Sequence, residues 1–341
     1  MDGNFFTKNE LQYDDSLITQ KSVAIILLLC IPVQAILAYL LGEISKSSRD
    51  VQILLSYFAS QAGFIISIAL FYRGKTKNAF ALLPLKPKIN PIAGIFAIGV
   101  ALGLIAQNMI ISYSFDWFLQ GVNIVYSIEM PNLANPVVEI FSIIVICALP
   151  AICEEIIFRG FLLKALRKSG NTIAAVVTSL IFAIFHLNLN QLLHQFIISF
   201  FLCNIVILTN KLIYGQIIHF FNNLVAILLA THVPSYANLG APNWSNALVL
   251  GIIAICGVCI LYPSLAGLLK NSVTTVSAKK IGNFLFAGLD KEERKQAQII
   301  DKEKRVYSNG RAYLLHPWVY VLIGLLVFLL IVLAVVAGMT S

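Results

Sequence analysis

Long apolar segments separated by short polar ones make up most of the chain. A helix needs about 20 apolar residues to cross a bilayer, and nine segments approach or reach that length. They lie at 22–42, 51–72, 91–112, 137–158, 171–187, 191–208, 213–231, 246–269 and 317–338. The strands of a membrane barrel would instead alternate between apolar and polar residues. The pattern therefore predicts an all-α polytopic membrane protein with about nine transmembrane helices.

The polar stretches divide the chain into four parts. We expect a cytoplasmic N-terminal tail at 1–21, a membrane domain at 22–269, a charged cytoplasmic loop at 270–314, and a C-terminal transmembrane helix with a short external tail at 315–341. The N-terminal tail at 1–21 is polar, and the apolar run that follows it lacks a small-residue cleavage site. A cleavable signal peptide is therefore not expected.

The composition agrees with lipid as the main solvent. Hydrophobic residues make up 59% of the 341 residues and charged residues only 12%, whereas soluble domains average about 25% charged residues. The formal net charge is +8. Six cysteines lie in apolar runs, so we interpret all six, including the Cys256–Cys259 pair, as small buried hydrophobic residues.

Lysine and arginine are concentrated in alternate loops. They are abundant at 73–90, 159–170 and 270–314, and they are missing from 113–136, 188–190 and 232–245. Only Lys46 and Arg49 fall on the opposite side of this pattern. The positive-inside rule then predicts a cytoplasmic N-terminus and an external C-terminus.

Ionisable side chains inside the apolar segments gather in three of them. Such groups are costly in a membrane and usually functional. The fourth segment carries Glu154, Glu155 and Arg159 near its end, the fifth ends in Phe182-Ala-Ile-Phe185-His186, and the seventh contains His219 and the Asn222-Asn223 pair.

Spacing predicts that Glu154 and His186 lie at the same level. Gly170 is a plausible helix stop, and the two residues lie 16 positions before and after it. In an antiparallel hairpin both would sit about 24 Å from the turn. The fourth helix would then continue as an amphipathic extension from Phe161 to Lys168, which explains why the fifth segment is short.

Helix periodicity separates the remaining groups. Glu155 and Arg159 are four residues apart and can pair on one helix face, which leaves Glu154 free. His219 and Asn223 share a face in the same way. A carboxylate and an imidazole can deprotonate a water, and imidazole and amide N–H groups can stabilise an oxyanion. Peptide hydrolysis needs only these two functions.

Each feature alone also has a structural interpretation. The Glu155–Arg159 pair alone is more readily a structural ion pair, and His186 and His219 could each be polar residues satisfied by a neighbouring helix. His194 is interpreted as structural. Together, two carboxylates, two histidines and an amide at compatible levels are difficult to explain by packing.

The three motifs resemble a known family. The runs EEIIFRGFLLKAL, SLIFAIFHL and IIHFFNN are similar to the EExxxR, FxxxH and HxxxN motifs of the CPBP family, the CAAX proteases and bacteriocin-processing enzymes, which includes the type II CAAX prenyl endopeptidases. The resemblance covers roughly 137–231. Every signature position is intact: Glu154, Glu155, Arg159, Phe182, His186, His219 and Asn223.

The resemblance implies a glutamate-type intramembrane endopeptidase that uses no metal and no cofactor. Glu154 and His186 would activate water, His219 and Asn223 would form the oxyanion hole, and Arg159 would hold Glu155. The charged loop and the ninth segment depart from a minimal family core and have no assigned role.

The expected substrate is a membrane-associated peptide or protein, and no nucleic-acid partner is expected. The residues FRGFL in the first motif are more typical of bacterial than of eukaryotic sequences, so we expect a bacterial plasma membrane. We also expect a role in peptide maturation, signalling or bacteriocin self-immunity rather than the cleavage of prenylated proteins. Two alternatives stay open. Glu154, His186 and His219 could form a His₂Glu zinc site, although HExxH is absent. The protein could also be a non-enzymatic immunity or scaffold protein.

Overall fold

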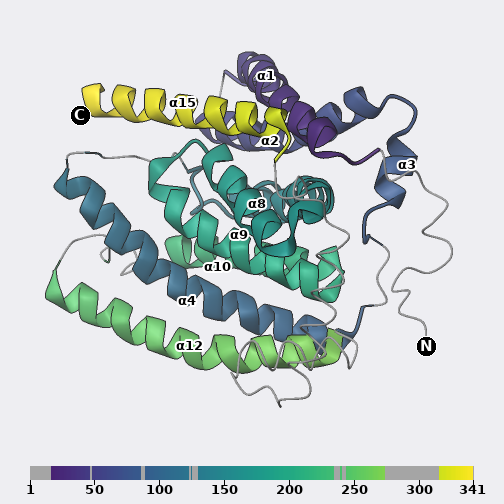
Figure 1. Cartoon of the computed structure of the whole chain (residues 1–341). Helices are drawn as coiled ribbons and strands as arrows, with labels where there is room; N and C mark the ends of the chain where they lie inside the picture. Colours follow the sequence, from purple (N-terminus) through teal and green to yellow (C-terminus); the bar gives the residue numbers. More distant parts are fainter. Residues whose placement is uncertain are drawn as a thin grey trace, which may run out of the picture.

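The computed structural model contains helices and no strands within the residues it describes, which are 17–46, 48–85, 89–122, 124, 130–233, 239, 243–272 and 315–340 (Figure 1). The helices are α1 (Gln20–Ile44), α2 (Arg49–Tyr72), α3 (Thr76–Ala81), α4 (Pro91–Gly121), a composite helix over Pro136–Leu166, α8 (Asn171–Phe185), α9 (Leu189–Thr209), α10 (Leu212–His232), α12 (Trp244–Ser272) and α15 (Pro317–Thr340).

Each of the nine predicted segments is helical, but the number of spans is smaller than predicted. Within the described residues, seven helices are long and apolar enough to cross a membrane, and they indicate an integral membrane protein. The apolar helices Asn171–Phe185 and Pro317–Val332 are shorter. The 15 residues of α8 extend about 22 Å, less than the roughly 30 Å of a bilayer core. The fifth segment therefore does not meet the length of a full span.

Asparagine caps fix where several of these helices begin. Asn90 and Asn135 each accept a hydrogen bond from a backbone N–H in the first turn of α4 and of the composite helix, and each is followed by proline at the first helical position. Proline is favoured there because its missing N–H has no partner in a helix. Asn188 caps α9 in the same way.

Two π-helical stretches interrupt the composite helix. It consists of α5 (Pro136–Ser142), η2 (Ile143–Ala148), α6 (Leu149–Glu154), η3 (Glu155–Leu162) and α7 (Leu163–Leu166). Pro150 follows the first π stretch and has no N–H, so the Ile146 carbonyl lacks its usual donor four residues ahead. The second π stretch begins at Glu155, within the predicted site. Isolated π turns in helices are frequent at functional sites.

A sharp turn at Gly170 joins the composite helix to α8. Its φ of 105° lies in a region that glycine adopts more readily than other residues. The helix continues through Leu166 and the 3₁₀ turn η4 (Arg167–Ser169) before this turn, and α7 packs against α8. The predicted hairpin and the continuation of the fourth helix beyond residue 158 are therefore both confirmed.

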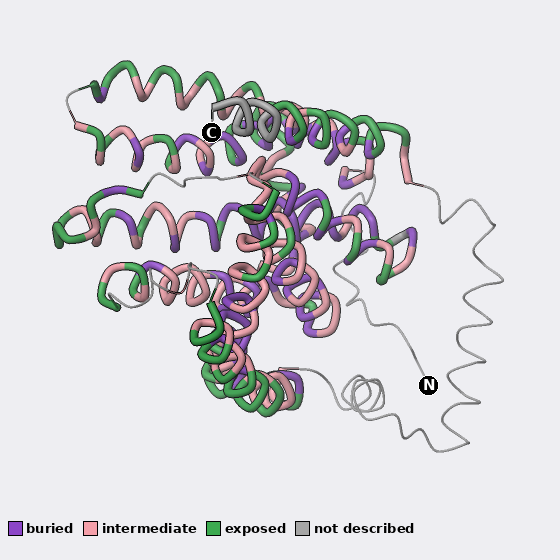
Figure 2. The backbone as a smooth tube through the Cα atoms, turned by 90° about the vertical axis from the view of Figure 1, so that its left-hand side faces the viewer, coloured by how far each residue is buried: buried purple, intermediate pink, exposed green. Residues whose placement is uncertain are grey.

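Two buried apolar clusters form the interior. The first joins α1, α2, the composite helix, α8 and α15, and the second joins α4, α9, α10 and α12. Exposed residues lie mainly on the outer helices, and buried residues gather where helices meet (Figure 2). Large apolar side chains such as Ile95 and Ile255 are about two-thirds exposed, at 68% and 67%. Apolar exposure on this scale is expected where lipid covers the surface.

The prediction that all six cysteines are buried is confirmed for four of them. Cys30, Cys147, Cys153 and Cys203 are buried, but Cys256 and Cys259 are exposed. Both exposed residues lie on α12, which packs mainly against α4 and leaves most of its own surface uncovered (Figure 1). The prediction that all six are buried was wrong for this pair.

Contacts between helix ends set the relative directions of the helices. The Gln20 side chain at the start of α1 donates to Ser169 Oγ (3.0 Å) and accepts from the His316 backbone N–H (2.6 Å), so α1, α8 and α15 begin close together. Lys164 Nζ donates to the Leu82 carbonyl (2.8 Å), so two positively charged segments also meet. The predicted charged loop at 270–314 and the tail at 1–21 lie largely outside the described residues.

These contacts lead to a prediction about topology. Because α15 begins beside the start of α1, and because positive charge favours the cytoplasm, reporters fused at Met1 and Ser341 should report opposite sides of the membrane. The measurement is an activity assay with paired reporters that work on only one side. The same side for both fusions would mean that one of the nine segments does not cross, most simply α15.

Candidate active site

A buried carboxylate connects the two central helices of the site. Glu155 Oε1 lies 2.9 Å from Arg159 Nη1 on its own helix and 2.9 Å from His219 Nδ1 on α10. The side chains of Glu155 and Arg159 are fully buried, and His219 is also buried. The ionised carboxylate can only accept, so His219 Nδ1 carries the proton of this hydrogen bond. Glu155 thereby orients the His219 ring.

The Phe182 ring packs against the charged and imidazole groups. The Arg159 guanidinium lies 4.3 Å from its centroid, a distance at which a cation is attracted to the ring face. Its centroid is 4.7 Å from that of the His186 ring and 6.2 Å from that of the His219 ring, in edge-to-face arrangements. The FxxxH and EExxxR motifs therefore meet at Phe182.

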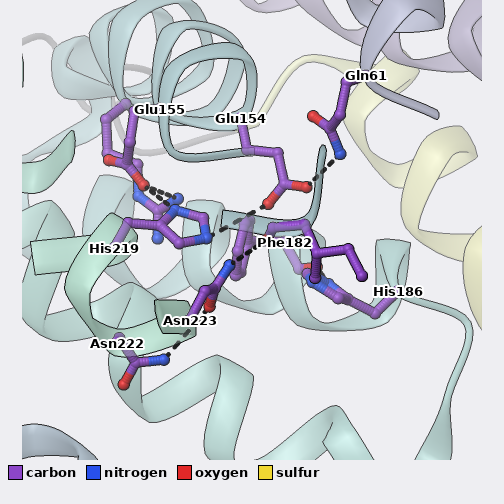
Figure 3. Close-up of polar contacts among 10 residues, drawn as sticks. Gln61, Glu154, Glu155, Phe182, His186, His219, Asn222 and Asn223 are labelled. Atoms are coloured by element: carbon purple, nitrogen blue, oxygen red, sulfur yellow. Dashed lines mark hydrogen bonds and ion pairs between the residues drawn. The ribbon is translucent and has the colours of Figure 1, made fainter. Parts of the chain in front are cut away.

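Glu154 faces the opposite nitrogen of His219. Its Oε2 lies 3.9 Å from His219 Nε2, and its Oε1 accepts a hydrogen bond of 2.9 Å from Gln61 Nε2 on α2 (Figure 3). The distance of 3.9 Å is too long for a direct hydrogen bond. A small polar group placed about 2.8 Å from both atoms would bridge them. Both atoms are therefore available to a reacting group.

His186 has one nitrogen fixed by the end of α8. Its Nδ1 lies 2.8 Å from the Phe182 carbonyl. That carbonyl belongs to the last turn of the helix, where backbone acceptors lack helical donors, and a carbonyl can only accept. Nδ1 is therefore protonated, and Nε2 is the nitrogen left for the site. The ring is near enough to Glu154 and to His219 for electrostatic interaction with both.

Asn223 contacts the backbone of the first π stretch. Its Nδ2 donates to the Ile146 carbonyl at 3.0 Å, the carbonyl to which Pro150, four residues ahead, cannot donate. One amide hydrogen of Asn223 is thereby used, and the second stays available to the site. Asn222 Nδ2 lies 3.5 Å from Asn223 Oδ1 (Figure 3).

The site lies where the two apolar clusters meet. Cys153, next to Glu154, belongs to the first cluster, and Ile218, next to His219, belongs to the second. Gly215 on α10 allows the helices to approach closely here, because a Cβ at this position would lie 2.8 Å from Glu155 Oε2. Any larger residue would push against the buried carboxylate.

The structure brings all the sequence-predicted site residues into one cluster, with a different set of contacts. Glu155 pairs with Arg159 as predicted, but it also holds His219, and His219 lies between the two carboxylates. A π turn holds more residues than an α turn, so neighbouring side chains diverge by a smaller angle, and Glu154 and Glu155 can both reach the same ring.

Sequence analysis missed Gln61, which is 4% exposed. The signal that could have identified it is its uncharged amide in the middle of the second apolar segment, because a polar group there is itself costly in a membrane. The amide of Gln107 turns away from the site and donates to the Ala254 carbonyl on α12 at 2.6 Å.

Within the part of the chain that the structure describes, no group of three or more His, Cys, Asp or Glu side chains is placed to hold a metal ion.

Comparison with known proteins adds one result. Residues 136–225 match the family model described as type II CAAX prenyl endopeptidase Rce1-like. No curated protein and no solved structure matched the chain. The matched segment contains both carboxylates, both histidines and the asparagine described above. Residues 136–225, the segment that carries these groups, therefore match the type II CAAX prenyl endopeptidase Rce1-like family, the CPBP family, and this segment is referred to as the family domain.

Proposed function

We propose that this protein is a metal-independent intramembrane endopeptidase that hydrolyses a peptide bond of a membrane-associated peptide or protein. The observation that carries the proposal is the position of His219 between two buried carboxylates, 2.9 Å from Glu155 and 3.9 Å from Glu154. Members of the matched family are intramembrane proteases, which supports the same function.

Glu154 is the proposed general base. Among the residues that the structure describes, the partner of its Oε2 is His219 Nε2 at 3.9 Å, so this oxygen can accept a proton from a water molecule placed between them. His186 Nε2, whose ring is oriented by the Phe182 carbonyl, would accept the second hydrogen of that water and hold it in place. The hydroxide then adds to the carbonyl carbon of the substrate, and Glu154 becomes protonated. General base catalysis of this kind contributes about 10²–10⁴-fold.

His219 and Asn223 are the proposed oxyanion donors. Two carboxylates and one guanidinium leave one uncompensated negative charge in a buried site, and buried charges are costly unless they are paired. Protonation of His219 would balance that charge, and its Nε2–H would then be a strong donor to the oxyanion. The unused Asn223 amide hydrogen would be the second donor. Collapse of the intermediate breaks the C–N bond, and Glu154 returns its proton to the leaving amine.

The substrate proposal follows from the location of these groups. Glu154 and His219 lie on helices of membrane-spanning length and are 9% and 6% exposed. A substrate has to reach them from the bilayer or its surface, as a membrane-associated peptide can. We further propose a bacterial plasma membrane and a cytoplasmic N-terminus, from the motif style and the Lys/Arg distribution.

The broadest test of this function compares intact protein with the Glu154→Ala variant in the same cells. Proteomics of the membrane fraction should show peptides or protein termini that are generated only by the intact protein. Crosslinking to the variant should capture the uncleaved precursor. If both forms restore the phenotype of a deletion strain equally, a scaffold or immunity protein is the better explanation.

Replacing Glu154 with glutamine should abolish cleavage without unfolding the protein. Glu154→Gln keeps the size of the side chain but removes the base, so turnover should fall by at least about 10²-fold. Thermal stability should be maintained, because a neutral amide costs less to bury than a carboxylate. Turnover by purified protein and a thermal melt measure the two effects. An active Glu154→Gln variant would contradict its role as base.

Replacing Glu155 should instead destabilise the protein. Glu155→Gln leaves the Arg159 guanidinium buried without its anion, and breaking a buried pair costs about 3–5 kcal/mol. Arg159→Ala should have a similar effect, because it leaves the Glu155 carboxylate without its cation. Melting temperature and membrane expression level are the measurements. A well-folded Glu155→Gln variant that is inactive, next to an active Glu154→Gln variant, would reverse the roles of the two carboxylates.

The zinc alternative has its own test. If Glu154 and His186 activate water alone, EDTA or 1,10-phenanthroline should leave turnover unchanged, and elemental analysis of the purified protein should find no stoichiometric zinc. Loss of turnover with chelator, restored by added zinc, would favour a His₂Glu site of Glu154, His186 and His219.

A further inference from the structure

An amide from outside the family domain contacts the proposed base. Gln61 lies on α2, whereas the family match begins at residue 136. Its Nε2 donates to Glu154 Oε1 at 2.9 Å, and the hydrogen bond is buried (Figure 3). The two residues are 93 positions apart in the sequence, and α2 packs against α6 at this point. The contact therefore depends on the packing of α2 against the composite helix.

Two other buried or half-buried glutamines show what a purely structural amide does in this protein. Gln34 on α1 donates to the Ser60 carbonyl of α2 at 2.8 Å, and Gln107 on α4 donates to the Ala254 carbonyl of α12. Both tie one helix to the backbone of the next. Gln61 differs from them because its hydrogen bond goes to the ionisable group that faces His219.

The hydrogen bond has one physical consequence for Glu154. It fixes one carboxylate oxygen, and the planar carboxylate then has Oε2 directed to the side of His219. A general base needs such an orientation, because it must lie within hydrogen-bond reach of the proton that it accepts.

We propose that Gln61 is a positioning residue for the general base, which orients the Glu154 carboxylate through the Nε2–H···Oε1 hydrogen bond. This inference rests on the proposed function for its catalytic consequence. The hydrogen bond itself can be tested whether or not the protein cleaves a substrate. Gln61 also has a carbonyl oxygen that is buried without a partner, so the amide makes no second hydrogen bond that would explain its place by packing alone.

Three variants of the full-length protein separate positioning from packing. Gln61→Met has nearly the same size and removes the donor. Gln61→Glu has the same shape and places a second carboxylate beside Glu154, where two like charges cannot both be ionised easily. Gln34→Met is the matched control, because it removes a glutamine that donates from α1 to α2 without contacting the site. A thermal melt of each purified variant reports packing.

Infrared difference spectroscopy tests the contact without a substrate. The carboxylate bands of Glu154 are assigned as the bands that the Glu154→Gln variant lacks. In Gln61→Met these bands should shift in frequency, because Glu154 Oε1 loses its hydrogen bond. Gln34→Met should leave the bands unchanged.

Cleavage provides the second measurement, with the membrane peptide identified by the comparison with Glu154→Ala. Gln61→Met should lower kcat by about 10- to 100-fold, the scale expected for a hydrogen bond to a charged group, with little change in KM. Gln61→Glu should also lower kcat, because an ionised carboxylate cannot donate to Glu154. Gln34→Met should change the melting temperature but not kcat.

Two sets of outcomes would overturn the inference. If Gln61→Met lowers the melting temperature as Gln34→Met does and leaves the Glu154 band unchanged, Gln61 is a packing residue only. If the bands shift but kcat does not change, the hydrogen bond exists without a role in positioning the base. If the unsubstituted protein cleaves nothing, the proposed function fails, and the infrared result still decides whether Gln61 holds the Glu154 carboxylate.

Discussion

The Glu155 carboxylate is the group on which the arrangement of the site depends. It is fully buried, and its Oε1 is shared by Arg159 of the same helix and His219 of α10. A buried charge without partners is very unfavourable, so the composite helix and α10 are held at the separation and rotation that satisfy this one oxygen. Gly215 allows that separation by leaving room for the carboxylate. The position of His219 opposite Glu154 is a consequence.

The hydrophobic pattern of the sequence was sufficient to predict most of the helices of the fold. Predicted and observed helix boundaries agree within a few residues for most segments, since a long apolar run in lipid has few alternatives to a helix. The pattern also showed that the fifth segment is short, and the positive φ of Leu187 marks where the chain turns from α8 into α9. The pattern could not place the π stretches, although Pro150, which has no N–H to donate to the Ile146 carbonyl, was visible in the sequence.

The site was predictable as a set of residues but not as a set of contacts. Equal spacing about Gly170 correctly anticipated a hairpin, and helix periodicity anticipated the Glu155–Arg159 pair at 2.9 Å. The bridge through His219 depends on the approach of α10, and the Gln61 contact depends on the packing of α2. The packing of α10 and of α2 against the composite helix cannot be derived from residue spacing within one segment.

The division between the family domain and the rest of the chain has a physical meaning. Residues 136–225 supply every ionisable group of the site, and these groups need partners that a membrane interior does not provide. Within the domain, Arg159 and His219 both contact Glu155 Oε1. Glu154 is different, because its short hydrogen bond comes from α2, outside the domain. The helices before residue 136 therefore do more than enclose the site. A related domain with another residue at the position of Gln61 would hold the same ionisable groups, with the carboxylate at the position of Glu154 oriented differently.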